Sequence, residues 1–394
     1  MEIRPAVNFE DTATAFRYKS DGALRKANFI FTVVNHPFVS WLATRMVQLG
    51  MSWRMPIKGI VRSTVFEHFC GGETIEKAER SIARLDEYNV KTILDYSVEG
   101  EKTEAGFDQT MEEILRTFDK AANSSQVPFC VFKVTGMGST ELLEKIQMKQ
   151  MLTYSEEDAY QKVRERVDRI CLRSSETGIP VLIDAEESWI QNPIDQIANE
   201  MMARYNQTKA LVFNTIQMYR IDGLPNLKES FHQAGMHNHF LGVKLVRGAY
   251  MEKERERAAK RGYPSPIQPS KEETDKAFNK ALQFCLDNKQ RISVVCGSHN
   301  EYSNQYLTML MQKHGLAAND GRVWFAQLLG MSDAISFNLA NAGYNVAKYV
   351  PYGPVESVMP YLLRRAEENT SVAGQSSREL VMIRRELNRR RRGA

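Results

Sequence analysis

Two adjacent arginines, Arg364 and Arg365, stand in the stretch MPYLLRRAEENTSV, residues 359–372. Two planar guanidinium groups near the start of a helix suit one carboxylate or phosphate, which they bind through paired hydrogen bonds. The alternative is a solvated helix face, because Arg364 and Glu368 have the i,i+4 spacing of a helix-stabilising ion pair. The pair alone leaves both interpretations open.

Polar residues also occur late in most of the short apolar runs of the chain. A strand end that reaches solvent explains any one of them, but together they indicate side chains that converge on one mouth. Lysines and arginines mixed with carboxylates suit an anionic ligand held beside internal counter-charges. Because side chains alternate along a strand, we expect residues two apart to share a face. The residues are Asp95, Lys133, Asp184 with Glu186, Gln217 with Tyr219, Lys244 with Val246 and Gly248, His299 and Tyr349.

Eight apolar runs rich in β-branched residues predict eight strands. Charged segments with helical spacing separate them, and strands that alternate with helices imply parallel strands joined by helical crossovers. Eight such units match a (β/α)8 TIM-type barrel, whereas an open doubly wound sheet often carries a glycine-rich phosphate loop that is absent here. The runs are 91–98, 128–136, 179–187, 209–219, 240–248, 291–300, 322–330 and 345–353.

The pattern divides the chain into three parts. Residues 1–88 read as a helical lead-in packed on the barrel, 89–378 as the catalytic barrel, and 379–394 as a basic C-terminal tail. The tail is expected to be solvated, with binding to an anionic membrane or to nucleic acid as the alternative.

Composition excludes several classes of protein. The 52 basic and 48 acidic residues of the 394 leave a net charge of +4, too balanced to indicate nucleic-acid binding. Five dispersed cysteines suggest neither disulfides nor a metal site, so a reducing compartment is expected. The first twenty residues argue against a secretory signal, and no membrane-spanning segment is expected. A cytoplasmic protein is expected, with peripheral contact at the inner face of the membrane as the alternative.

Four sequence blocks resemble those of a known family. VKLVRGAY (243–250), LIDAEES (182–188), SHN (298–300) and YLLRRAEEN (361–369) are similar to conserved blocks of the proline dehydrogenases, and the similarity runs from residue 91 to 372. That family consists of (β/α)8-barrel FAD enzymes that oxidise L-proline to Δ1-pyrroline-5-carboxylate. The block KLVRGAYM has lysine and arginine in the reverse order to RLVKGAYW, the block often found in bifunctional bacterial members.

The resemblance implies roles for individual residues. Arg364 and Arg365 would clamp the proline carboxylate. The other substrate-binding residues would be Lys133, Asp184, Tyr250, Leu328 and Tyr349. The FAD contacts would be Gln217, Lys244, Val246, Arg247, Gly248, Ala249, Lys271, Thr274, His299 and Glu368. Glu99, on the loop after the first strand, would pair with Arg364 as a gate, with a solvated glutamate as the alternative.

The resemblance also implies the reaction. Hydride would pass from proline C5 to flavin N5 without a further catalytic side chain or metal, a membrane quinone would reoxidise the flavin, and a pyrroline-5-carboxylate dehydrogenase would use the product. A monofunctional enzyme is expected. Two alternatives stay open. One is a hydroxyproline dehydrogenase, against which the bulk of Tyr349 argues. The other is a phosphate-binding barrel isomerase or aldolase without flavin that uses Lys133 or Lys244.

Overall fold

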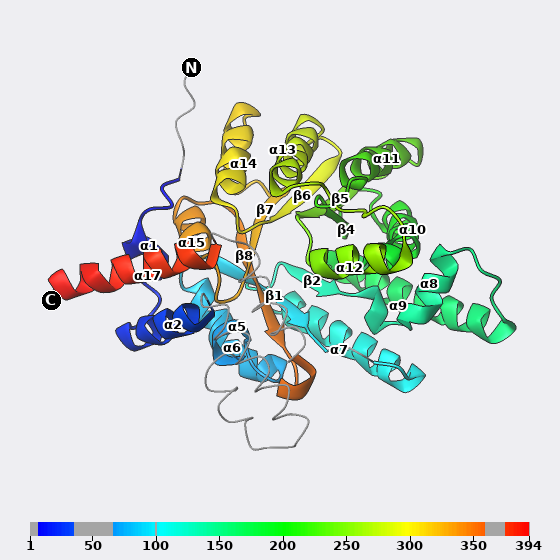
Figure 1. The fold of residues 1–394 in the computed structure, drawn as a ribbon, viewed down its shortest axis with the longest axis horizontal. Coiled ribbons are helices and arrows are strands. Elements are labelled where there is room, and N and C mark those ends of the chain that lie inside the picture. The colour runs from blue at the N-terminus through cyan, green and yellow to red at the C-terminus, as the bar shows by residue number, and fades with distance from the viewer. Residues whose placement is uncertain (1–6, 35–65, 99–100, 359–374, 394) are drawn as a thin grey trace.

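Eight parallel strands form the centre of the molecule. The computed structural model describes residues 7–34, 66–98, 101–358 and 375–393, and within them β1 to β8 close into one barrel in chain order (Figure 1). Each predicted apolar run overlaps one strand, so the predicted (β/α)8 barrel is confirmed. The strands are β1 (Val90–Tyr96), β2 (Phe129–Phe132), β3 (Val181–Ile183), β4 (Val212–Gln217), β5 (Leu241–Val246), β6 (Ile292–Gly297), β7 (Val323–Leu328) and β8 (Val346–Tyr352).

Helices surround the barrel, and local sequence sets where they start and stop. The long helix α9 begins at Thr153, which forms a capping box with Glu156, and ends at Gly178, whose φ of 70° suits a residue without a side chain. The helices between strands are α7 (Glu104–Ala122), α8 (Thr140–Gln147), α9 (Tyr154–Thr177), α10 (Ser188–Tyr205), α11 (Gly223–Met236), α12 (Met251–Arg261), α13 (Lys271–Asp287), α14 (Glu301–Lys313) and α15 (Asp333–Asn341), with the short 3-10 helix η2 (Val134–Gly136).

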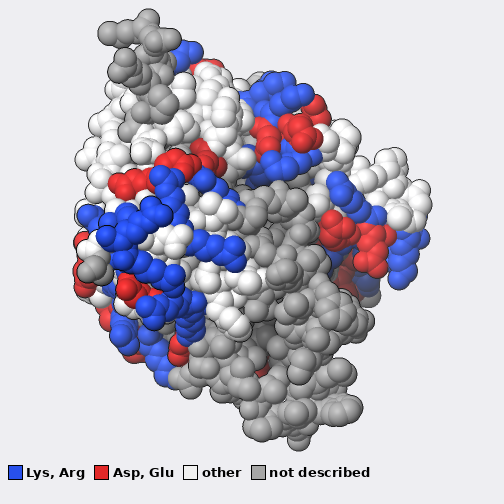
Figure 2. Space-filling model, turned by 60° about the vertical axis from the view of Figure 1, so that its left-hand side comes forward, with Lys and Arg blue, Asp and Glu red and all other residues white. Residues whose placement is uncertain are grey.

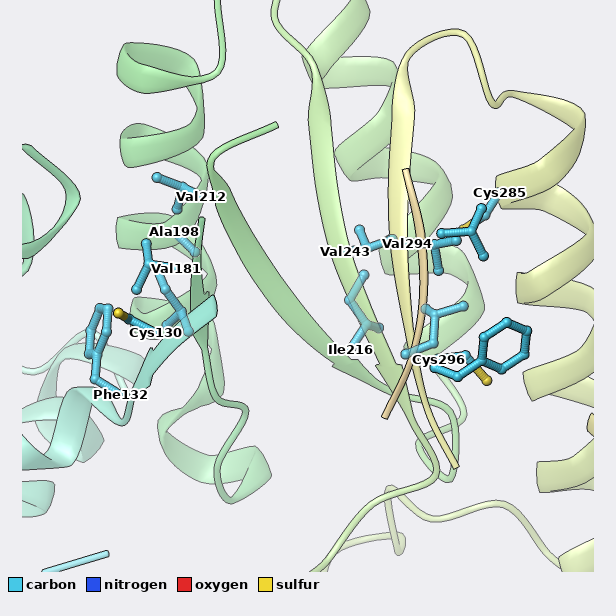
Figure 3. Close-up of a cluster of buried hydrophobic side chains, with 14 of the residues drawn as sticks. Cys130, Phe132, Val181, Ala198, Val212, Ile216, Val243, Cys285, Val294 and Cys296 are labelled. Atoms are coloured by element: carbon cyan, nitrogen blue, oxygen red, sulfur yellow. The ribbon is translucent and has the colours of Figure 1, made fainter. Parts of the chain in front are cut away.

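Two apolar layers hold the barrel. Inside it, Phe129 packs edge-on against Phe213 and Trp324, with ring centroids 5.6 and 5.3 Å apart. Outside it, strand residues such as Val294 meet helix residues such as Cys285 of α13 (Figure 3). Burial on both faces explains why the strands read as continuous apolar runs.

The barrel closes where its first strand meets its last. β1 pairs with β8 in parallel from Val90 opposite Val346 to Tyr96 opposite Tyr352. Gly72 bridges to Tyr352 as well, which ties the start of α6 to the same seam. The helices in the described parts of the first 88 residues are α1 (Thr12–Phe16), α2 (Asp21–Val34), α5 (Glu67–Phe69) and α6 (Ile75–Asp86).

The C-terminal segment differs from the solvated tail expected from its sequence. It forms helix α17 (Gln375–Arg392), which lies beside α1 and α2 in Figure 1. Leu380, Met382 and Ile383 are buried in one apolar cluster with Phe16 and Leu24. Burial of such side chains contributes about 1.5–3 kcal/mol each, which offsets the cost of ordering a basic segment. In the described ranges, none of the helices is long and apolar enough to span a bilayer.

Candidate functional site

A cavity of about 270 Å³ opens at the carboxyl ends of the strands, where barrel enzymes carry their chemistry. Ligand pockets span roughly 300–1,000 Å³, so the described walls enclose space for part of a large ligand or one small one. The structure brings most of the proposed site residues to this cavity: Lys133, Asp184, Gln217, Lys244, Val246, Arg247, Gly248, Ala249, Tyr250, Lys271, His299, Leu328 and Tyr349.

Lys244 lies in the middle of the cavity wall and joins two strands across the barrel. Its ammonium donates to a carboxylate oxygen of Asp184 after β3 and, over 2.5 Å, to the hydroxyl of Tyr349 on β8. Only 5% of its side chain is exposed, so the charge depends on these partners rather than on water. The same ammonium lies 4.6 Å from the centre of the Tyr349 ring. The contact fixes the ring of Tyr349 in the cavity wall.

A second ammonium shares the carboxylates of this wall. The Nζ of Lys133 lies 3.6 Å from Asp184 and 3.9 Å from Asp95, and the hydroxyl of Ser97 donates to Asp95 over 2.8 Å. Two lysines thus face two aspartates, and the described wall is balanced in charge. An anionic ligand bound here therefore requires further cationic groups.

Arg247 forms the other end of the cavity and is held on every side. Its guanidinium donates to Asp275, Ser298 and Ser303 over 2.7, 2.8 and 2.9 Å, and lies 4.5 Å from the centre of the Phe278 ring. These contacts hold the planar guanidinium group of Arg247 in a single orientation. Lys271 also pairs with Asp275, over 2.6 Å, so Arg247 and Lys271 share this carboxylate.

Glycine at position 248 lets the backbone of the cavity wall lie on a tyrosine ring. Gly248 has a φ of 139°, which side chains rarely adopt, and a Cβ there would collide with the ring of Tyr219. The absent side chain would point at Tyr219, which does not line the cavity, so the glycine lets the chain pass close to this ring while Gly248 itself lines the cavity.

The structure also shows cavity residues that strand-end reasoning missed. Gln327 and Ser298 line the cavity, and the Gln327 amide donates to the Ser298 carbonyl over 3.1 Å while accepting from Ser336 over 2.9 Å. Gln327 is the penultimate residue of β7, so the signal that singled out Gln217 on β4 was present here too.

Comparison with known proteins identifies the family. The family model described as "Proline dehydrogenase" matches residues 78–378. This chain belongs to the proline dehydrogenase family. Proline dehydrogenase 1, mitochondrial, of Dictyostelium discoideum is 32% identical over 428 residues, covering 96% of this chain and 74% of the relative. The hydroxyproline dehydrogenase of Xenopus laevis is 30% identical over 426 residues, covering 99% and 91% respectively.

A solved structure has the same fold. Proline utilization A from Bdellovibrio bacteriovorus, inactivated by N-propargylglycine, superposes with a TM-score of 0.71 at 19% identity. The alignment covers 93% of this chain and 37% of that much longer chain, so the likeness concerns the barrel and its helices alone. Together with the family match, it confirms the prediction of a barrel oxidoreductase that acts on proline.

Several residues that the sequence linked to the site do not line the described cavity. Glu186 and Tyr219 do not line the cavity, because β3 ends at Ile183 and β4 at Gln217, and the alternation of side chains ends with the strand. Thr274 lies within α13, where its hydroxyl donates to the Ser270 carbonyl over 3.2 Å. Four further proposed residues fall outside the described residues: Glu99, Arg364, Arg365 and Glu368.

Buried Glu186 makes the stability of this proline dehydrogenase depend on pH. Burial raises the pKa of Glu186 to about 7, against hydrogen bonds from Thr135 that lower it. In the folded state Glu186 keeps a proton that the unfolded chain, with an ordinary glutamate pKa near 4.5, releases. Its stabilisation is therefore complete below pH 4.5 and lost as the pH rises through 7.

We expect Glu186→Gln to flatten the fall in stability between pH 5 and pH 8. Glutamine stays neutral throughout, so the proton-linked contribution of this side chain disappears. Urea unfolding at four pH values measures the slope, with Glu176→Gln, a half-exposed glutamate of α9, as the control. An unchanged slope in Glu186→Gln would contradict the assignment.

Proposed function

We propose that this chain oxidises L-proline to Δ1-pyrroline-5-carboxylate with FAD as cofactor, as the first step of proline catabolism to glutamate. The observation that carries the proposal is the cavity at the strand ends, which is lined by the cationic residues Lys133, Lys244 and Arg247 together with Gly248 and Tyr349. FAD, when bound, would accept at N5 the hydride that leaves C5 of proline. The protein's part is to bind, orient and shield the reactants.

The wall from β4 to β6 has the chemistry of a flavin site. Arg247 offers a guanidinium held in place by Asp275, and Gln217 is fixed by donating to the Glu186 carbonyl over 2.7 Å. His299 and Gly248 line the same wall. Hydrogen-bond donors placed in this way match the polar edge of a flavin ring and its phosphates. The remaining proposed FAD contacts are Lys244, Val246, Ala249, Lys271, Thr274 and Glu368.

The wall from β2, β3 and β8 has the chemistry of the substrate side. Lys133 would bind the proline carboxylate, and Tyr349 and Leu328 would press the ring toward the flavin. Because the described lysines are already balanced by Asp95 and Asp184, the substrate carboxylate requires added positive charge. Arg364 and Arg365, outside the described residues, are proposed to supply it. Asp184 and Tyr250 complete the proposed substrate wall.

One experiment tests the proposal. We expect the purified chain to show a flavin absorbance band, and L-proline to bleach it without oxygen while L-lactate and glycine do not. A preparation without flavin would overturn the proposal and favour a phosphate-binding barrel isomerase or aldolase. A flavin that proline fails to reduce would exclude proline as substrate.

Hydroxyproline dehydrogenase is the second candidate, because one relative over nearly the whole chain carries that name. The side chain at position 349 is the proposed discriminator. We expect Tyr349→Ser to weaken proline binding and to raise the relative efficiency with hydroxyproline, since the smaller side chain leaves room for a ring hydroxyl. The ratio of the two kcat/KM values measures this, with Tyr349→Phe as the control that removes only the hydroxyl bonded to Lys244. An unchanged ratio in Tyr349→Ser would show that Tyr349 does not discriminate between proline and hydroxyproline.

We further propose a membrane quinone as electron acceptor and a pyrroline-5-carboxylate dehydrogenase as the user of the product. The exposed face of α17, with Arg384, Arg385, Arg389, Arg391 and Arg392, supports contact with an anionic membrane at its inner face. Figure 2, in which the side bearing α17 and α2 is turned forward, shows basic side chains gathered there with some acidic ones beside them. A lid closed by Glu99 and the division at residues 88 and 378 stay proposals too.

A further inference from the structure

The loop that joins β7 to α15 carries part of the cavity wall and is held from behind by charged groups. Leu328, the last residue of β7, and Met331 of the loop line the cavity. Lys348, which points out of β8 and is fully buried, donates to their carbonyl groups over 3.3 and 2.7 Å. The position of this wall therefore depends on residues that do not themselves line the cavity.

Four buried charged residues from four parts of the chain meet behind the loop. Asp333 pairs with Lys19 over 2.7 Å and with Lys348 over 2.9 Å, and Glu379 of α17 completes the group. Tyr18 donates to Asp333 over 2.7 Å. Burial opposes the ionisation of Asp333, but the two ammonium groups outweigh it and hold its pKa below the ordinary value. The two lysines are thus engaged chiefly by Asp333.

Glu379 is the member of this group that touches the loop backbone. One of its carboxylate oxygens accepts the N–H of Ser332 over 3.0 Å, and the other has no hydrogen-bond partner among the described residues. Burial and the neighbouring charge of Asp333 raise the pKa of Glu379 to about 7. Burial also keeps His68 neutral, with a pKa of about 3, beside Lys19 and Asp333.

Ser332 has an unusual conformation for the residue that precedes a helix. Its φ of 52° and ψ of 43° lie in the left-handed region, which costs a residue other than glycine roughly 1–3 kcal/mol. Its hydroxyl makes no cap to α15 but instead contacts Nδ1 of His299 in the cavity wall, over 2.9 Å. The strained backbone is what directs the hydroxyl away from the helix and toward the cavity.

We propose that Glu379 is a positioning residue: by holding the Ser332 backbone in its left-handed conformation, it fixes the ring of His299 in the cavity wall. The C-terminal helix thereby sets the affinity of the cavity for FAD, an inference that rests on the flavin site proposed above. Ser332 is the link, because its N–H meets Glu379 and its hydroxyl meets His299.

Two substitutions at position 379 separate this role from simple loss of charge. Glu379→Leu and Glu379→Gln both remove the negative charge, but only glutamine keeps an oxygen that accepts the Ser332 N–H. We expect Glu379→Leu to raise the Kd for FAD of the full chain about three- to tenfold, the effect of one hydrogen bond. Glu379→Gln should stay near the wild-type value. Equal effects of the two substitutions would overturn the proposal.

A third variant keeps the test valid if Glu379→Leu fails to fold. Ser332→Gly suits the left-handed backbone, so the loop keeps its path while the hydroxyl that meets His299 is lost. We expect the same rise in Kd, and a shift of the His299 ring-nitrogen resonances in isotope-labelled protein, assigned with His299→Gln. Glu386→Gln, at another buried glutamate of α17, is the matched control and should change neither.

The resonance measurement also separates this inference from the proposed function, because it is made without cofactor. Unchanged His299 resonances in Ser332→Gly and Glu379→Leu would overturn the linkage even if the wild-type chain binds FAD. Shifted resonances in a chain that binds no FAD would support the linkage and overturn the flavin site.

Discussion

Lys244→Met is expected to lower the free energy of unfolding by about 3–5 kcal/mol, the usual cost of removing one partner of a buried ion pair. Among the described residues, the substitution leaves Asp184 with the more distant ammonium of Lys133, 3.6 Å away, and it removes the ammonium that donates to the Tyr349 hydroxyl. We also expect reduction of bound flavin by proline to become undetectable, since the tyrosine and the aspartate both lose their fixed positions. Urea unfolding and anaerobic stopped-flow absorbance measure the two effects.

The matched control is Lys276→Met. Lys276 also pairs with a carboxylate, that of Glu273 at 2.6 Å, but 64% of its side chain is exposed. Water replaces the partner at such a site, so neither stability nor flavin reduction should change measurably. A wild-type rate of flavin reduction in Lys244→Met would show that Lys244 supports the fold alone.

Arg247→Met is expected to raise the Kd for FAD about 10- to 100-fold, because charge-assisted hydrogen bonds contribute roughly 1.5–3 kcal/mol. Methionine keeps the contact with the Phe278 ring but loses the hydrogen bonds to Asp275, Ser298 and Ser303, although Asp275 retains its ion pair with Lys271. The Kd of Arg247→Lys should lie between those of the wild type and Arg247→Met, since lysine restores the charge without the planar guanidinium group. Titration of the cofactor-free wild type and of both variants with FAD measures the three Kd values.

The control for this prediction is an arginine with two partners at the surface. Arg116 pairs with Glu76 and Glu113, and 55% of its side chain is exposed. Arg116→Met should bind FAD as the wild type does. If Arg247→Met also does, the cavity end at Arg247 is not the flavin site and the proposed assignment of that wall fails.

The barrel and much of the cavity were accessible from the sequence for a specific reason. Strands buried on both faces read as apolar runs, and the parallel arrangement brings all their carboxyl ends to one edge. A polar residue near the end of a run, such as Lys133, Asp184 or Lys244, was therefore expected at that edge. The rule failed two residues after Asp184 and Gln217, at Glu186 and Tyr219, because the strand had ended and the alternation with it.

The buried charge cluster was not accessible in this way. Asp333 and Lys348 lie 15 residues apart and face each other only because α15 folds back over β8, while Lys19 and Glu379 come from opposite ends of the chain. No local pattern marks a lysine that points out of a strand as fully buried. Helix α17 was missed for a related reason, since its arginines outnumber the few apolar residues that dock it.

The seam between β1 and β8 has a consequence for the newly made chain. The seven residue pairs of this seam join positions about 250 residues apart, so at ~5–20 residues per second the ribosome delivers β8 roughly 10–50 s after β1. Throughout that interval β1 has an unpaired edge, the kind of surface that templates association between chains. The yield of folded protein will depend on what shields β1 until translation reaches its partner.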